Sequence, residues 1–232
     1  MKILFMGRKQ VSANLLRFLT KQDHIEIVGV LTDSHLQGSP TTAAAQELGL
    51  PLYTFDTALE AMREGRLKYD LGLSVLYWRK LRDEFLSIPT LGTINFHPAL
   101  LPEYKGTGGY NLAIMDELNQ WGNTAHYVDA SIDTGEIIEV DRFPIDAETE
   151  TAQSLERKTM QALEDFARRI ITRAIESKTK LPTTPNIGGR YVSRDEMEAM
   201  KQICDGDDIE KKIRAFWFPP YDGAYVEING QK

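Results

Sequence analysis

The chain has 232 residues, of which 42% are hydrophobic and 26% are charged. This composition excludes an intrinsically disordered or fibrous protein, and the length fits one large domain or one domain with a small extension. The 34 acidic residues outnumber the 27 basic ones and give a net charge of -7, which slows approach to a polyanion. Large nucleic acids are therefore poor partner candidates, whereas a small anionic ligand remains possible.

The cysteine content and the first residues bear on the compartment. Cys204 is the only cysteine, which excludes an intrachain disulfide and a cysteine-rich metal site and fits a reducing compartment. The apolar run at 3–6 is too short for a signal peptide or a membrane span. We therefore expect a cytoplasmic protein without a metal site and without a membrane partner.

Apolar runs that suit buried strands alternate with segments of helical periodicity over the first hundred residues. The runs are 3–6, 25–31, 52–55, 70–76 and 93–96, and the helical segments between them are 11–19, 41–48, 57–67 and 82–87. This alternation predicts an α/β fold with a doubly wound, mostly parallel, Rossmann-like sheet. Such sheets bind ligands beyond the carboxyl ends of their strands, so we expect the site to follow Phe5, Leu76 and Phe96.

The second half of the chain is predicted to complete this domain and to add a small extension. A helix near 108–118, two antiparallel strands at 124–128 and 136–143, and a long helix from about 151 to 177 close a catalytic domain at 1–180. The extension at 181–232 begins with a Gly- and Pro-rich tail. It continues with a helix at 207–216 and a hairpin near 225–228, which we expect to contact substrate or a second subunit.

Two polar side chains close the strand at 93–96. Asn95 and His97 are two residues apart, which places them on the same face of a strand. Burying an amide beside an imidazole costs free energy unless both find partners, so a structural pair is one reading and a shared site is the other.

A carboxylate follows the next strand. Asp133 stands in a turn before Gly135, and it could hydrogen-bond a protonated His97, raise the pKa of that imidazole and relay a proton. A plain Asx-turn at 133–135 is the alternative, because Asp-x-Gly turns are common.

Three spaced motifs carry a family resemblance. They are Asn95-Phe96-His97-Pro98 at a strand end, the loop Leu100-Leu101-Pro102-Glu103-Tyr104-Lys105-Gly106, and His126-Tyr127-Val128 followed by Asp133-Thr134-Gly135. Over roughly residues 1 to 180 the chain resembles the formyltransferases that use 10-formyltetrahydrofolate. The resemblance implies that Asn95 and His97 face a developing oxyanion, and that His97 moves a proton while Asp133 orients it.

The resemblance also implies a folate pocket, formed by the loop after the middle strand and the turn before Asp133. The residues at these positions are Leu76, Tyr77, Trp78, Arg79, Lys80 and Leu81 in the loop, and Asp129 and Ile132 in the turn. Ordinary packing of Trp78 and solvent exposure of Arg79 and Lys80 are the alternatives.

Within the family, the chain is most similar to sugar-nucleotide N-formyltransferases of the dTDP-4-amino-4,6-dideoxyglucose type. It shares with them its size and the tail elements at 188–191 and 213–216. A ribonucleotide acceptor calls for a Gly- and Ser-rich phosphate loop, but 7–14 holds one Gly. The methionyl-tRNA branch adds a basic barrel, for which the tail is too short and the net charge has the wrong sign.

The acceptor is thus expected to be a nucleotide-linked amino-dideoxy sugar, with O-antigen or other surface polysaccharide synthesis as the setting. Lys105, Gly106 and Thr107 are predicted at the mouth of the cleft, and Trp217 and Tyr221 are predicted to stack on the base. A solvated lysine and an aromatic homodimer seam are the alternatives.

The base, the sugar configuration and the position of the amine stay open. Another small amine as acceptor, including a glycinamide ribonucleotide, or a catalytically silent folate- or nucleotide-binding module, also stays open.

Overall fold

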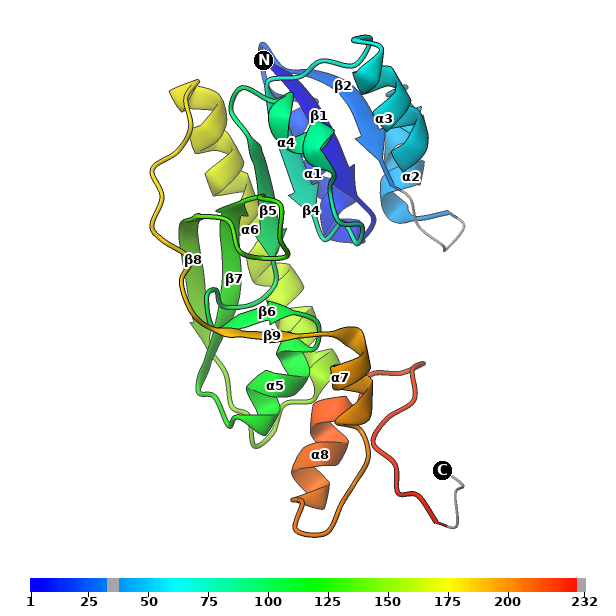
Figure 1. The fold of residues 1–232 in the computed structure, drawn as a ribbon, viewed down its shortest axis with the longest axis vertical. Helices are drawn as coiled ribbons and strands as arrows, with labels where there is room; N and C mark the ends of the chain where they lie inside the picture. The colour runs from blue at the N-terminus through cyan, green and yellow to red at the C-terminus, as the bar shows by residue number, and fades with distance from the viewer. Residues whose placement is uncertain (33–37, 229–232) are drawn as a thin grey trace.

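The computed structural model describes residues 1–32 and 38–228 and contains a seven-stranded sheet with the order β3-β2-β1-β4-β5-β7-β8 (Figure 1). The strands β1 to β5 are parallel, whereas β7 is antiparallel to both β5 and β8. Their bounds are Lys2–Gly7 (β1), Glu26–Leu31 (β2), Leu52–Tyr53 (β3), Leu71–Val75 (β4), Thr93–His97 (β5), Gln120–Tyr127 (β7) and Ile137–Pro144 (β8). The predicted mostly parallel α/β sheet is confirmed.

Helices cover both faces of this sheet, which explains why its parallel strands read as continuous apolar runs. On strand β1, Ile3 and Phe5 belong to the core beneath one set of helices, and Leu4 and Met6 belong to the core beneath the other set. The first set is α1 (Gln10–Leu19), α2 (Pro40–Glu47) and α6 (Ala152–Ser177), and the second is α3 (Phe55–Arg63) and α4 (Asp83–Ser87).

Local sequence signals set the ends of two of these helices. Helix α6 begins after Thr151, whose side chain accepts a hydrogen bond from the Ser154 backbone N–H in a reciprocal capping box. Helix α3 ends at Arg63, four residues before its predicted end at Leu67, because Gly65 adopts a φ of +71° and turns the chain.

The carboxyl-terminal part of the chain packs against the loops and helix that follow β5. Strand β6 (Tyr104–Gly106) pairs in parallel with β9 (Arg190–Val192), and the short helix α7 (Arg194–Ala199) follows β9. Helix α8 (Ile209–Phe216) packs on α5 (Gly109–Met115). The sequence did not predict β6, β9 or α7, since each is short and the two strands are paired across a long stretch of chain.

Two features of the extension concern the predictions for the end of the chain. Tyr225 forms an isolated parallel bridge with Gln202. The hairpin was predicted near 225–228, and no β-strand is found over these described residues. The division of the chain at residue 180 stays a prediction.

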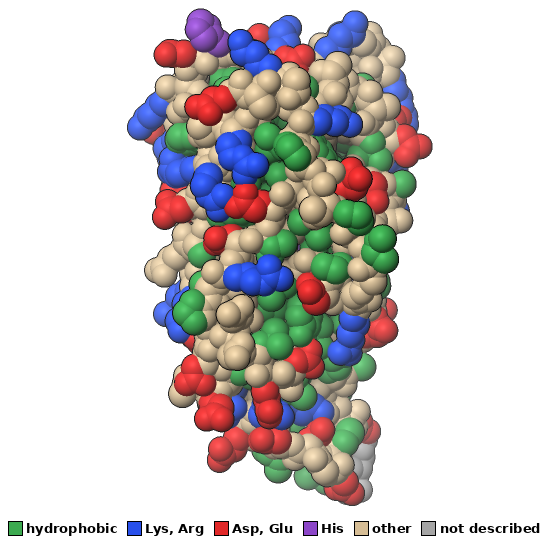
Figure 2. Space-filling view, turned by 90° about the vertical axis from the view of Figure 1, so that its left-hand side faces the viewer, with side chains coloured by type: hydrophobic (Ala, Val, Ile, Leu, Met, Phe, Trp, Pro, Cys, Tyr) green, Lys and Arg blue, Asp and Glu red, His purple; other side chains and the backbone are tan. Residues whose placement is uncertain are grey.

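The surface and the helix lengths add two observations. Within 1–32 and 38–228, no helix combines the length and the apolar character needed to cross a membrane. Figure 2 shows acidic and basic side chains interspersed over one face of the molecule, with hydrophobic side chains between them.

Candidate active site

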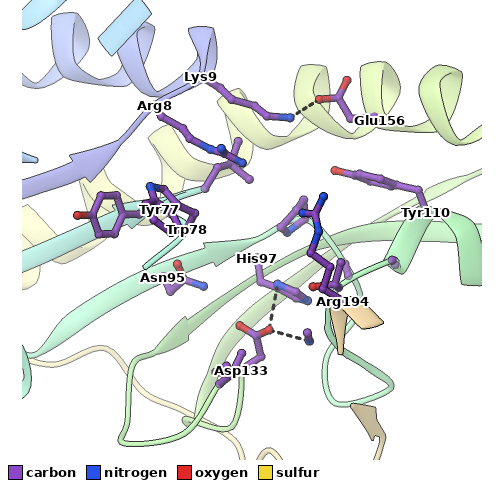
Figure 3. Close-up of a pocket in the computed structure, with 18 of the residues that line it drawn as sticks. Arg8, Lys9, Tyr77, Trp78, Asn95, His97, Tyr110, Asp133, Glu156 and Arg194 are labelled. Carbon is purple, nitrogen blue, oxygen red and sulfur yellow. Dashed lines mark hydrogen bonds and ion pairs between the residues drawn. The ribbon is translucent and has the colours of Figure 1, made fainter. Parts of the chain in front are cut away.

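A cavity of about 1140 Å³ lies at the carboxyl ends of β1, β4 and β5, where the strand order reverses between β1 and β4. This is the position at which doubly wound sheets bind ligands. Asn95, His97 and Asp133 all line the cavity (Figure 3). The structure therefore brings together, from strand β5 and from the turn before β8, the three side chains that the sequence singled out.

The amide of Asn95 is held by neighbours on both sides of its strand, because Ser74 of β4 and His126 of β7 stand opposite it in the sheet. The Ser74 hydroxyl donates to Asn95 Oδ1 at 2.7 Å, and Asn95 Nδ2 lies 3.0 Å from His126 Nε2. His126 Nδ1 lies 2.8 Å from the backbone oxygen of Tyr127, which can only accept, so Nδ1 carries the proton.

In the neutral ring, His126 Nε2 is then an acceptor for Asn95 Nδ2. This fixes which end of the amide bears the N–H groups. The second N–H of Asn95 is left available to a ligand in the cavity.

His97 is buried, with 8% of its surface exposed. Its Nε2 donates to the backbone oxygen of Tyr104 at 2.9 Å, and its Nδ1 lies 3.6 Å from Asp133 Oδ2. Burial lowers the pKa of His97 below its usual range, although Asp133 and the Tyr104 carbonyl act in the opposite direction. In the neutral ring Nδ1 holds the lone pair, so His97 can take up a proton on the side that faces the carboxylate.

Asp133 is ionised in this setting. Its Oδ2 accepts a hydrogen bond of 2.9 Å from the Gly106 N–H, and its Oδ1 lies 3.6 Å from His126 Nε2. Burial by itself would raise the pKa of Asp133, but His97, His126 and the Gly106 N–H outweigh burial and lower it to about 2. The residue also adopts a φ of +54°, a strained conformation of the kind that clusters at functional sites.

The loop predicted to hold a folate lies on the cavity wall, since all six residues from Leu76 to Leu81 line it, as do Asp129 and Ile132. Leu76 adopts a φ of +57°. Trp78 is 48% exposed, and the Arg79 guanidinium lies 5.3 Å from the centre of its ring. The Asp129 carboxylate accepts hydrogen bonds from the Ser131 N–H and the Thr134 hydroxyl, which hold it within its own turn.

The residues predicted to bind the acceptor fall into two groups. Gly106, Thr107 and Tyr221 line the cavity, whereas Lys105 and Trp217 are not among its lining residues. Lys105 is buried and its Nζ donates to the backbone oxygen of Gly188 at 2.8 Å. The N–H of Gly106 is engaged by Asp133. Trp217 is half exposed at the end of α8.

The cavity also contains cationic residues that sequence reasoning did not single out. Arg8 lies after β1 and Arg194 begins α7, and both line the cavity (Figure 3). Neither forms an ion pair with another described residue, and Arg8 Nε is buried without an acceptor there. Nearby, Lys9 is neutralised by Glu156 at 2.6 Å. These arginines differ from ordinary surface cations only because both lie in one cavity, and their sequence contexts contain no motif that indicates this.

Comparisons with known proteins bear on the family and the fold of this chain. The family model described as formyl transferase matches residues 1–173. The methionyl-tRNA formyltransferase of Lysinibacillus sphaericus (strain C3-41) is 29% identical over 245 residues, which cover 98% of this chain and 75% of that protein.

Two solved structures are similar over nearly the whole chain. One is an N-formyltransferase from Helicobacter canadensis in complex with folinic acid and dTDP-3-aminofucose, with a TM-score of 0.78, 24% identity and coverage of 99% of this chain and 85% of that one. The other is a 4-N formyltransferase from Francisella tularensis, with a TM-score of 0.80, 20% identity and coverage of 100% and 94%. At these identities the two structures show a shared fold. The family match spans most of the chain and includes Asn95, His97 and Asp133, and the chain therefore belongs to the formyl transferase family of enzymes.

Proposed function

We propose that this enzyme transfers the formyl group of 10-formyltetrahydrofolate to the amine of a nucleotide-linked amino-dideoxy sugar. The observation that carries the proposal is one cavity, in which the Asn95, His97 and Asp133 cluster adjoins the loop at Leu76–Leu81 and two arginines without ion-pair partners among the described residues. Its volume of about 1140 Å³ slightly exceeds the range of about 300–1,000 Å³ for single-ligand pockets, which suits two substrates.

The donor is assigned to the wall formed by Leu76–Leu81 and by Asp129 and Ile132. These residues line the same cavity as the catalytic cluster and include the apolar residues Leu76, Leu81 and Ile132. The folinic acid in the Helicobacter canadensis structure supports a folate in a fold of this kind. The donor supplies the formyl carbon that the amine attacks.

The chemistry requires charge and proton control, and the three side chains are suited to both. As the amine attacks, negative charge grows on the formyl oxygen, and the oriented N–H of Asn95 can donate to it. The new N–C bond leaves the amine cationic, and the Nδ1 of neutral His97 can accept its proton. Asp133 stabilises the imidazolium, which can return the proton to N10 of the folate as the old C–N bond breaks.

The acceptor is assigned to the part of the cavity that contains Arg8 and Arg194. A guanidinium without an ion-pair partner is suited to bidentate binding of a phosphate, and two of them can share the charge of a diphosphate. Phe218 and Tyr221 also line the cavity and offer aromatic faces to a base. The dTDP-3-aminofucose of the Helicobacter canadensis structure is a ligand with this chemistry.

Methionyl-tRNA is the second candidate acceptor, because the relative from Lysinibacillus sphaericus is named a methionyl-tRNA formyltransferase. That relative is 29% identical over an alignment that covers 98% of this chain. The net charge of -7 disfavours a polyanion of that size. The two acceptors are separated by direct assay.

The test is a formyl-transfer assay with 10-formyltetrahydrofolate and a panel of dTDP- and UDP-linked amino sugars, glycinamide ribonucleotide and methionyl-tRNA. Tetrahydrofolate release and product mass are followed for the wild type, for His97→Ala and for His24→Ala, a matched control at an exposed histidine. We expect a mass gain of one formyl group on a sugar nucleotide, which His97→Ala loses and His24→Ala keeps. Formylation of methionyl-tRNA alone would overturn the acceptor assignment.

A further inference from the structure

Residues 181–192, here called the strap, follow α6 and lie beyond the residues matched by the family model. The strap runs past β7 and β8 to β6. The Leu181 N–H donates to the Tyr127 hydroxyl at 2.8 Å, and Thr184 forms an antiparallel bridge with Ile137 at the start of β8. Its first residues are thus fastened to the two strands that flank the turn of Asp133.

Asn186 of the strap holds the turn itself. Its Nδ2 donates to the backbone oxygens of Asp133 at 3.0 Å and of Gly135 at 2.9 Å. These carbonyls belong to the turn in which Asp133 is held at a positive φ. A residue in that conformation persists only when its surroundings fix it, and Asn186 supplies two of the fixing contacts.

The end of the strap holds the other partner of the Asp133 carboxylate. Strand β9 pairs with β6, where the Gly106 N–H donates to Asp133 Oδ2. A Cβ on Gly106 would stand 2.4 Å from the Val192 oxygen, and one on Gly189 would stand 1.5 Å from the Pro102 oxygen. The two backbones therefore approach so closely that only glycine fits at either position.

We infer that the strap completes the active site, with Asn186 as a positioning residue that sets the location of Asp133 relative to His97. The inference rests on the proposed formyl transfer, in which Asp133 stabilises protonated His97. Asn186 of the strap binds the backbone oxygen of Asp133. Strand β9 of the strap pairs with β6, whose Gly106 N–H binds the Asp133 carboxylate. The strap therefore constrains both the backbone and the carboxylate of Asp133.

The same arrangement gives Lys105 a different role from the acceptor contact predicted from the sequence. Its ammonium donates to the Gly188 oxygen of the strap and is buried. If Lys105 holds β6 to the strap, its loss displaces Asp133 and lowers kcat. If Lys105 binds the acceptor, its loss raises the KM of the acceptor.

The experiment compares Asn186→Ala with Thr183→Ala, a control that removes a strap hydrogen bond to Glu136 and leaves the turn of Asp133 untouched. The His97 imidazole is titrated by NMR in labelled protein, which needs no acceptor. Asp133 raises the pKa of His97, so in Asn186→Ala that pKa moves further below its usual range, while Thr183→Ala leaves it in place. Identical His97 titrations in all three proteins would overturn the inference, whatever the acceptor proves to be.

Turnover adds two readouts. We expect Asn186→Ala to lower kcat by about tenfold to a hundredfold with little change in either KM, since a displacement of about 1 Å at a reacting group costs up to about a hundredfold. In the Asp133→Asn background the same substitution should have almost no further effect, and a full additional loss would assign Asn186 a merely structural role.

Lys105→Met is the second variant and serves if Asn186→Ala does not fold. It loosens the strap from the side of β6, and we expect a fall in kcat with an unchanged acceptor KM. A raised acceptor KM with unchanged kcat would return Lys105 to the acceptor site and count against the strap.

Discussion

The charge of Asp133 can be removed with little change in shape by the substitution Asp133→Asn. The carboxylate lies 3.6 Å from His97 Nδ1, and at an effective dielectric constant of about 20 two unit charges at this separation attract by about 5 kcal/mol. Burial offsets part of this attraction for both groups. We expect the substitution to remove about 2–3 kcal/mol of stabilisation from the imidazolium, which lowers kcat roughly 30- to 150-fold.

The new amide adds a second effect. Gly106 N–H requires an acceptor, so the amide oxygen takes the place of Oδ2, which also lies nearest to His97 Nδ1, and the amide N–H groups take the place of Oδ1 opposite His126 Nε2. An N–H directed at His126 Nε2 competes with the Asn95 amide for the lone pair of that nitrogen.

The assay measures kcat by tetrahydrofolate release and titrates His97 by NMR in the same variant. We expect the pKa of His97 to fall further below its usual range, because Asp133 raises it in the wild type. A kcat within about threefold of wild type together with an unchanged His97 titration would refute the proposed role of Asp133.

The same substitution changes the response of the fold to acid. The pKa of Asp133 is lowered from 3.8 to about 2 by the fold, so ionised Asp133 stabilises the native state, fully above pH 4. That contribution, about 2 kcal/mol, is lost as the pH falls from about 4 to about 2. Denaturant unfolding across this window should be steeply pH-dependent in the wild type and flatter in Asp133→Asn, and parallel curves would contradict the linkage.

Three further predictions concern the surroundings of Asp133. Asn95→Ala removes the oxyanion donor and should lower kcat by about a hundredfold with KM nearly unchanged, and steady-state kinetics with wild-type turnover would exclude that role. Ser74→Ala should lower kcat much less than His126→Leu, because the Ser74 hydroxyl can bind either end of the Asn95 amide. His126 Nε2 can only accept, so it alone orients the amide. Equal losses of kcat in the two variants would contradict this orientation. Gly106→Ala should lower the free energy of unfolding by about 2–4 kcal/mol, because its Cβ would stand 2.4 Å from a β9 oxygen. Gly188→Ala, at a similar φ but with nothing within 4 Å of its Cβ, should lower it by about 1–2 kcal/mol. Equal losses in thermal unfolding would show that the strap moves to accommodate a methyl group.

The sequence by itself determined the elements whose patterns are local. The continuous apolar run of β1 and the helical stripe of α6 depend on residues a few positions apart, and so does the cap at Thr151. The same period of two placed Asn95 and His97 on one face of β5, and the motifs around them identified the chemistry. The end of α3 was misjudged because the apolar pattern continues to Leu67, past the turn at Gly65.

The tertiary structure decided which of these groups meet. Ser74 and His126 become partners of Asn95 only through the register of β4, β5 and β7, and sequence spacing does not specify a register between distant strands. Arg8 and Arg194 enter one cavity, and Lys105 turns away from it to the strap, because of how the chain returns across the sheet. Periodicity records whether a side chain is buried, whereas the partner it finds depends on long-range packing, and for Asp133 that packing includes a strap more than fifty residues further along the chain.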